Sequence, residues 1–302
     1  MFSRLRSKLK RLFSPRRETA KSGKSAKSAA TRPNFVFAIP IAGYSNDTQW
    51  EHLSELLLRT VRSALNQRDP NFRIFIAGHE RPERLDEITD ERVEFISVSF
   101  DKPTSPKARR QDKTRKRWAI AARYRTLGGG YFMYLDADDY VHRDLVGYVL
   151  EDDSRSGYFI PEGYALDYKN ATLAPIPGAW RKPFNHVCGS SGIVYFRERD
   201  LPRNPFPEQR LRRDKYFKIR NHLSFQDVAL GERPNTPVPF RAAIYNVNNE
   251  LNLSNVIVRT PERQQRLIEG IRKRKIKDDK EILEAFGVVD LVESPSKTDS
   301  PS

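Results

Sequence analysis

Three carboxylates directly follow a short apolar segment of the chain. Residues 131–135 are Tyr-Phe-Met-Tyr-Leu, and Asp136, Asp138 and Asp139 come next. Carboxylate oxygens are ligands that Mg²⁺ and Mn²⁺ prefer, and such an ion commonly offsets the charge of phosphate oxygens in a bound nucleotide. The same acids also suit a plain turn, in which Asp side chains accept hydrogen bonds from nearby backbone. The elements around them decide between these two interpretations.

The apolar segment before these acids is predicted to be a buried strand. Its five residues are too few to span a membrane, and the glycines at 128–130 end the element that precedes it. That preceding element is strongly basic, since residues 101–125 contain ten Lys and Arg but only two Asp. From Asp112 onward, apolar side chains recur at spacings near three and four, which predicts a helix. Lys113 and Arg117 lie on this helix, one turn apart.

Strands and a helix also alternate in the first part of the chain. Pro40 stands at the end of the first apolar segment, where its missing N–H costs no ladder hydrogen bond. Thr48 and Glu51 form a capping box, which predicts the start of a helix with one apolar face. Strand, helix and strand in this order predict a right-handed crossover between parallel strands. The predicted strands are residues 35–41, 72–77 and 93–98, in addition to the segment before Asp136.

Several such units predict an α/β fold with an open, mostly parallel sheet and helices on both faces, similar to a Rossmann fold. Ligands bind to such sheets outside the carboxyl ends of the strands, where the three acids are expected. After the acids, the pattern predicts strands near 157–161, 164–168, 191–196 and 240–247, loops at 174–178 and 203–207, a short helix at 225–230 and one or two charged helices within 261–286.

Length and composition favour one globular domain with tails. The chain has 302 residues, of which 38% are hydrophobic, and this suffices for one core of about 200 residues or more. The single cysteine, Cys188, excludes an intramolecular disulfide framework and fits a reducing compartment. No segment has the roughly 18 consecutive apolar residues of a membrane-spanning helix. The expected parts are a basic tail at 1–32, the main domain at 33–255, a helical extension at 256–290 and a disordered tail at 291–302.

Much of the net charge of +15 lies in the N-terminal tail. Residues 1–32 contain eleven Lys and Arg against one acid, Glu18. If residues 1–14 are helical, their apolar side chains fall within an arc of about 100°, which is typical of a helix lying on an anionic membrane. We therefore expect the protein in the cytoplasm, peripherally bound to the inner face of the cell membrane. A disordered basic tail, a nucleic-acid arm and an organelle transit peptide remain alternatives.

Taken in order, three motifs resemble those of family 2 glycosyltransferases of bacterial type, which have the GT-A fold. The first is the strand that ends in Ile39-Pro40, and the second is Ser63-Ala64-Leu65-Asn66-Gln67, followed by an aromatic residue and a strand. The third is the apolar strand that runs into Asp136-Ala137-Asp138-Asp139. The resemblance covers about residues 34–232 and implies that the chain transfers a sugar from a nucleotide-sugar donor.

The resemblance implies roles for the three acids and for the helix before them. Asp136 would contact the sugar or base of the nucleotide. Asp138 would hold a divalent metal ion, Mn²⁺ or Mg²⁺, that bridges the diphosphate, and Asp139 would support the loop or the donor sugar. Lys113 and Arg117 would lie near the nucleotide, where a cation offsets phosphate charge.

Pro40, Tyr44 and Glu80 are further donor contacts that the resemblance implies, although the chain departs from the family at these positions. The loop after Pro40 is longer than the Pro-x-Tyr-Asn of many relatives. Where relatives often have Asp-Asp-Gly-Ser, this chain has Ala-Gly-His-Glu-Arg at 77–81, so the acid that contacts the base is either missing or replaced by Glu80. These departures leave the identity of the nucleotide open. The segment Gly189-Ser190-Ser191-Gly192 either shapes a donor or acceptor pocket or forms a simple turn.

An inverting transferase also needs a base that takes the proton from the attacking acceptor hydroxyl. Residues 224–230 resemble the family motif that supplies this carboxylate, with Gln226 in the position of the usual Glu. Asp227 is therefore the predicted base, and a helix-capping Asp is the alternative. His142 and His222 are candidates for a third metal ligand.

The resulting prediction is a metal-dependent glycosyltransferase of the hexosyltransferase type, using a UDP- or GDP-linked sugar. A tail that faces a membrane favours a glycan or lipid-linked acceptor, as in polysaccharide biosynthesis. One alternative is a non-catalytic protein whose basic segments bind anionic lipid or nucleic acid. Another is nucleotidyl transfer, which is disfavoured because residues 41–46 lack repeated glycines and a basic residue. Nucleic acid is not expected as a partner.

Overall fold

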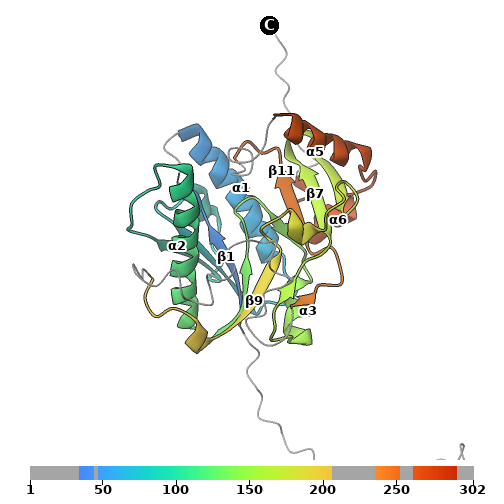
Figure 1. The fold of residues 1–302 in the computed structure, drawn as a ribbon. Helices are drawn as coiled ribbons and strands as arrows, with labels where there is room; N and C mark the ends of the chain where they lie inside the picture. Colours follow the sequence, from blue (N-terminus) through green and yellow to red (C-terminus); the bar gives the residue numbers. More distant parts are fainter. Residues whose placement is uncertain (1–33, 44–46, 206–234, 252–260, 291–302) are drawn as a thin grey trace, which may run out of the picture. The chain divides into compact units, whose positions relative to one another are not determined.

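The computed structural model describes residues 34–43, 47–205, 235–251 and 261–290. The chain separates into two compact units, Met1–Arg32 and Pro33–Ser302, and every described residue belongs to the second. This second unit contains two β-sheets with helices packed against them (Figure 1). The α/β class predicted from the sequence is therefore confirmed.

The large sheet consists of β1 (Asn34–Pro40), β2 (Phe72–Gly78), β3 (Val93–Ser97), β4 (Gly129–Tyr134), β6 (Tyr158–Phe159), β9 (Gly192–Arg197) and β10 (Thr236–Pro237). Their order across the sheet is β10-β6-β9-β4-β1-β2-β3. β1 pairs in parallel with β2 and β4, and β2 pairs in parallel with β3. β9 is antiparallel to both of its neighbours. The sheet is mostly parallel, as predicted, and β1, β2 and β4 end at the same edge.

The central strands of this sheet are buried on both sides because helices cover both of its faces. Phe35 and Phe37 of β1 belong to the same core as Leu57 of the first helix, whereas Val36 packs in a second core with Trp118. Successive residues of a strand point to opposite faces, so a strand covered on both faces is apolar throughout. Figure 1 shows the helix that carries Trp118 on the near side of the sheet. The α-helices are α1 (Asp47–Leu65), α2 (Pro106–Arg125), α3 (Leu145–Asp152), α5 (Pro261–Lys273) and α6 (Lys280–Phe286).

α2 begins six residues before the predicted start at Asp112. Ser105 caps it, because the Ser105 hydroxyl accepts a hydrogen bond from the Ala108 N–H at 3.2 Å, and Pro106 occupies the first turn. A Ser cap followed by Pro is a strong helix start that does not depend on apolar periodicity. The first turn carries no apolar stripe, so a prediction based on periodicity placed the start too late.

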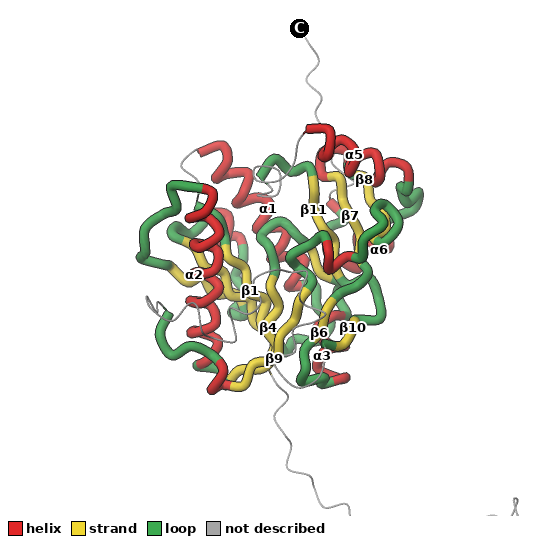
Figure 2. The backbone as a smooth tube through the Cα atoms, in the orientation of Figure 1, coloured by secondary structure: helices red, strands yellow, loops and turns green. Residues whose placement is uncertain are grey.

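The smaller sheet consists of β5 (Tyr140–Val141), β7 (Gly163–Asp167), β8 (Thr172–Ile176) and β11 (Ala243–Val247), in the order β5-β11-β7-β8 (Figure 2). Its strand β8 corrects the prediction of a loop at 174–178. Pro175 lies in β8 opposite Tyr164 of β7. β8 is an edge strand, where proline is tolerated because one side of the strand makes no ladder hydrogen bonds.

The two C-terminal helices confirm the prediction of charged helices within residues 261–286. α5 packs on β7 and β8. The indole Nε1 of Trp180 donates a hydrogen bond to the Leu267 carbonyl at 3.2 Å, which ties the loop after β8 to this helix. α6 supplies Phe286, which is fully buried against Tyr164. Among the helices described, none is both long enough and apolar enough to cross a membrane.

Candidate active site

The three predicted acids follow β4, at the edge of the large sheet where its parallel strands end. The register places Ala38 of β1 beside Tyr134 of β4, and Pro40 beside Ala77 of β2. The Leu135 N–H still donates to the Ala38 carbonyl at 3.1 Å, so the chain leaves the sheet only after this residue. The acids therefore lie at the carboxyl ends of parallel strands, which is where α/β sheets bind ligands.

Asp136 lies against two cations of α2. Its Oδ1 is 2.6 Å from the Lys113 Nζ and 3.5 Å from an Arg117 guanidinium nitrogen. The Asp136 N–H donates to the Ser190 hydroxyl at 2.9 Å. The guanidinium of Arg117 also lies over the Tyr134 ring, 4.7 Å from its centre, and this contact fixes its direction. The structure thus brings together three of the predicted donor-binding residues.

Asp138 is held by a residue that lies far away in the sequence. The side-chain amide of Asn249 donates to Asp138 Oδ2 at 2.7 Å. Burial, together with the neighbouring Asp136 carboxylate, raises the pKa of Asp138 to about 6. A raised pKa means that negative charge is disfavoured at this point of the fold. A bound cation would remove that penalty.

Asp139 holds the local structure together and faces away from solvent. Its Oδ2 accepts hydrogen bonds from the Ser190 hydroxyl at 2.6 Å and from the Cys188 thiol at 3.2 Å, and its Oδ1 accepts from the Asn246 N–H at 3.1 Å. Burial and the nearby Asp138 and Asp136 raise its pKa well above the ordinary value. Of its two possible roles, support of the loop fits these contacts.

The segment around Ser190 comes close to the acids because it contains a glycine. A Cβ at Gly189 would lie 3.2 Å from Asp136 Oδ2, closer than nearly all side-chain contacts. Ser190 itself is fully buried and bridges the backbone of Asp136 to the carboxylate of Asp139. Of the two interpretations of Gly189-Ser190-Ser191-Gly192, close backbone approach to the site agrees with this geometry.

A buried polar cluster anchors α2 to the ends of β1 and β2. The Lys116 ammonium is fully buried, and it donates to Asp112 Oδ2 at 2.6 Å and to the Ile41 carbonyl at 2.9 Å. The other Asp112 oxygen lies 2.7 Å from His79 Nε2. Burial lowers the pKa of Lys116, and Asp112 opposes that shift. Because Lys113 and Arg117 follow directly after Asp112 and Lys116, this cluster fixes which part of α2 faces Asp136.

Replacing Lys116 with Met is expected to lower the free energy of unfolding by about 3 kcal/mol, because it leaves the buried Asp112 carboxylate without its cation. Lys113→Met is the matched control on the same helix. Lys113 is partly exposed, so loss of its ion pair with Asp136 is expected to cost about 1 kcal/mol or less. Urea unfolding followed by circular dichroism measures both variants. Equal effects of the two changes would contradict an anchoring role for Lys116.

The donor set at the acids suits a hard divalent cation that is only partly held by the protein. Within the described residues, no group of three or more His, Cys, Asp and Glu side chains is arranged to hold a metal ion. Mg²⁺ and related ions commonly bind through one or two carboxylates, several waters and the phosphates of a substrate. Asp138, together with the diphosphate of a donor, fits that pattern, and the excess negative charge around Asp138 favours it.

The other predicted site residues have different surroundings. Pro40 is buried at the end of β1, as expected. Glu80 is exposed after β2 and forms an ion pair with Lys102, whereas the neighbouring His79 points inward to Asp112. His142 packs against the rings of Phe240 and Phe286, each with its centre 5.3 Å away, which is the environment of a structural histidine. Tyr44, His222, Asp227 and residues 1–32 lie outside the described residues.

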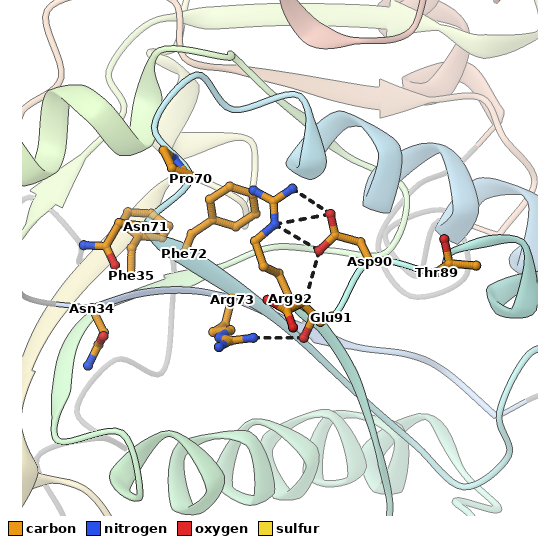
Figure 3. A pocket seen from close by; sticks show the side chains of 10 residues that line it. All are labelled: Asn34, Phe35, Pro70, Asn71, Phe72, Arg73, Thr89, Asp90, Glu91 and Arg92. Carbon is orange, nitrogen blue, oxygen red and sulfur yellow. Dashed lines mark hydrogen bonds and ion pairs between the residues drawn. The ribbon is translucent and has the colours of Figure 1, made fainter.

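A cavity of about 640 Å³ lies at the opposite edge of the large sheet, near the amino ends of β1 and β2 (Figure 3). Arg92 contacts both carboxylate oxygens of Asp90, and its guanidinium lies 4.5 Å from the centre of the Phe72 ring. Arg73 donates to the Glu91 carbonyl at 2.9 Å. Arg92 and Asp90 thus satisfy each other, whereas the bond from Arg73 goes to a backbone carbonyl. None of the predicted site residues lines this cavity, so we do not assign the reaction to it.

Sequence reasoning missed Asn249 and the role of His79 in the cluster on α2. Asn249 follows β11 in a segment with no recognisable motif, and only the pairing of β11 with β5 and β7 brings it to the acids. His79 stands in the position of the family's acidic loop, and the only sequence signal for its partner was that Asp112 is one of two acids in the basic segment 101–125. The folded chain brings both residues to their partners, and no local spacing in the sequence indicates these contacts.

A mostly parallel α/β sheet with carboxylates and cations gathered at the ends of its strands is the arrangement of a nucleotide-binding enzyme. The family model "Glycosyl transferase family 2" matches residues 51–220. The chain therefore belongs to the family 2 glycosyltransferases, its large sheet is that of the GT-A fold, and it is a glycosyltransferase. Comparison with individual curated proteins gives no significant match.

Proposed function

We propose that this glycosyltransferase moves a hexose from a UDP- or GDP-linked donor to a hydroxyl of a glycan or lipid-linked acceptor. Mn²⁺ or Mg²⁺ would be held by Asp138 and would neutralise the diphosphate as it leaves. The observation that carries the proposal is the pair of cations on α2, Lys113 and Arg117, directed at Asp136 beside Asp138. Cations and a metal-binding acid within one cluster suit a diphosphate better than a neutral ligand.

In this proposal, some residues bind the donor and another residue transfers the proton. Lys113 and Arg117 offset the charge of the diphosphate, and Asp136 orients the nucleotide. Asp227 takes the proton from the acceptor hydroxyl as the oxygen attacks the anomeric carbon, and the bond from that carbon to the diphosphate breaks. Attack from the opposite side to the leaving group inverts the configuration at the anomeric carbon.

Thermal unfolding with a panel of nucleotide-sugars, with and without Mn²⁺, tests the proposal. A true donor is expected to raise the melting temperature only when the metal is present. The stabilisation is expected to grow with the logarithm of the donor concentration above its dissociation constant. A panel in which UDP- and GDP-sugars give no metal-dependent shift would refute the proposed donor class.

We further propose that residues 1–14 hold the protein on the anionic inner face of the cell membrane. Deleting residues 1–30 is expected to abolish co-sedimentation with vesicles that contain an anionic lipid, because most of the excess positive charge lies in that tail. Donor binding is expected to be unchanged. Deleting only residues 22–30, the linker that lacks large apolar side chains, is the control and should leave vesicle binding intact. Full vesicle binding by the chain without residues 1–30 would exclude the tail as the anchor.

A further inference from the structure

Asn249 is a buried amide in contact with the predicted metal-binding acid. It follows the end of β11, its exposed fraction is 1%, and its side-chain nitrogen donates to Asp138 Oδ2 at 2.7 Å. Its side-chain oxygen accepts from the Leu251 N–H at 3.2 Å. The amide is thus held at both ends, and its donor is directed at one oxygen of Asp138.

Three contacts hold the turn around Asn249 against the rest of the described chain. The Asn248 side chain donates to Asp167 Oδ1 at 2.8 Å, and Glu250 forms an ion pair with Lys169. His52 of α1 contacts the Asn249 carbonyl oxygen, with 2.8 Å between the ring nitrogen and that oxygen. The turn therefore has little freedom to move relative to α1 or to the smaller sheet.

The same turn has an unusual backbone. Asn248 and Glu250, on either side of Asn249, have positive φ values of 62° and 66°. Asn tolerates this region, whereas Glu adopts it only with backbone strain. Such a conformation persists only where the surroundings compensate for it, and it concentrates at functional sites. Here the conformation places the Asn249 side chain against Asp138.

We propose that Asn249 is a positioning residue that fixes the orientation of the Asp138 carboxylate for a divalent cation. This inference rests on the proposed function, since it assumes that Asp138 binds the metal. A hydrogen bond from Asn249 to one oxygen stops rotation of the carboxylate and directs its other oxygen at one place. Partners of this kind typically change metal affinity by about 10 to 100-fold when they are removed.

Binding of Mn²⁺ alone, followed by electron paramagnetic resonance of the free ion, tests this role without any turnover. Asn249→Ala is expected to weaken Mn²⁺ binding by about 10 to 100-fold. Asn66→Ala is the matched control, because the Asn66 side chain donates to the Glu284 carbonyl of α6 at 3.2 Å and not to the turn around Asn249. The control variant is expected to bind Mn²⁺ as the wild type does. Wild-type affinity in Asn249→Ala would overturn the proposal.

Asn249→Asp provides a second test that does not depend on the alanine variant being folded. It places a carboxylate beside Asp138, so the melting temperature in EDTA is expected to fall. Mn²⁺ is then expected to raise that temperature by more than it raises the temperature of the wild type. An equal rise in both proteins would show that residue 249 does not face the metal. If the wild type binds no Mn²⁺ through Asp138 either alone or with a nucleoside diphosphate, the proposed function fails, whereas wild-type binding with no effect of either variant refutes only the role of Asn249.

Discussion

Asp227→Asn is expected to lower kcat by about 10²-fold or more while leaving the dissociation constant of the donor unchanged. The amide has nearly the shape of the carboxylate but does not accept the proton of the acceptor hydroxyl. Initial rates at saturating donor and acceptor give kcat, and titration calorimetry with the donor gives the binding constant. A loss confined to kcat is the result expected for a group that acts in the transition state.

Asp214→Asn is the control for this experiment, since it makes the same chemical change in the same part of the sequence. It is expected to leave kcat within about twofold of the wild type, because Asp214 lies outside residues 224–230, the segment that resembles the family motif for the base. Equal turnover in the Asp227 variant and in this control would identify Asp227 as a helix cap and not as the base.

Asp138→Asn is expected to abolish metal-dependent binding of the nucleotide, lowering affinity by on the order of 10²-fold or more, because a neutral amide is a poor ligand for Mg²⁺ or Mn²⁺. Titration calorimetry with the nucleoside diphosphate, with and without Mn²⁺, measures the effect. Asp144→Asn is the control, since the Asp144 carboxylate pairs with Arg68 at 2.8 Å and otherwise lies 3.7 Å from the ring of His142, which packs as a structural histidine. Metal-independent binding that survives the Asp138 change would exclude this acid as the metal ligand.

Unfolding does not explain the expected loss in the Asp138 variant. The pKa of Asp138 in the folded protein is about 6, above the value of an unperturbed Asp. A carboxyl with a raised folded pKa stabilises the protein most below its unfolded pKa, and that stability is lost as the pH rises through the folded value. At pH 7 without metal the negative charge of Asp138 lowers the free energy of unfolding, so Asp138→Asn is expected to be at least as stable as the wild type. Thermal unfolding in EDTA checks this.

Local sequence patterns were sufficient to predict most of the large sheet. Strands β1, β2 and β4 are largely apolar on both faces, and the glycines at 128–130 mark the start of β4, which begins at Gly129. The predicted ends of helices and strands were less accurate, because they depend on capping residues and on strand pairing. α1 begins at Asp47, so the predicted cap Thr48 lies inside the helix, and α2 begins at Pro106. β8 was missed because two prolines suggested a loop, although an edge strand accepts one.

The site residues that could be predicted from the sequence are those that lie close to one another along the chain. Asp136 and Asp138 are two residues apart in sequence, and Lys113 and Arg117 are one helical turn apart. The partners that hold the acids come from far along the chain, since Ser190 is 54 residues from Asp136 and Asn249 is 111 residues from Asp138. No local pattern specifies those pairings, because they depend on where β9 and β11 join their sheets.

The contacts of Asp139 limit how early the candidate site can assemble during synthesis of the chain. Its buried carboxylate needs the N–H of Asn246, which lies 107 residues further along the chain. A ribosome adds roughly 5 to 20 residues per second, so Asn246 is synthesised roughly 5 to 20 s after Asp139. Contacts of such long range also form late in folding. A nascent chain that has completed β4 but not yet residue 246 therefore lacks one of the contacts that hold Asp139.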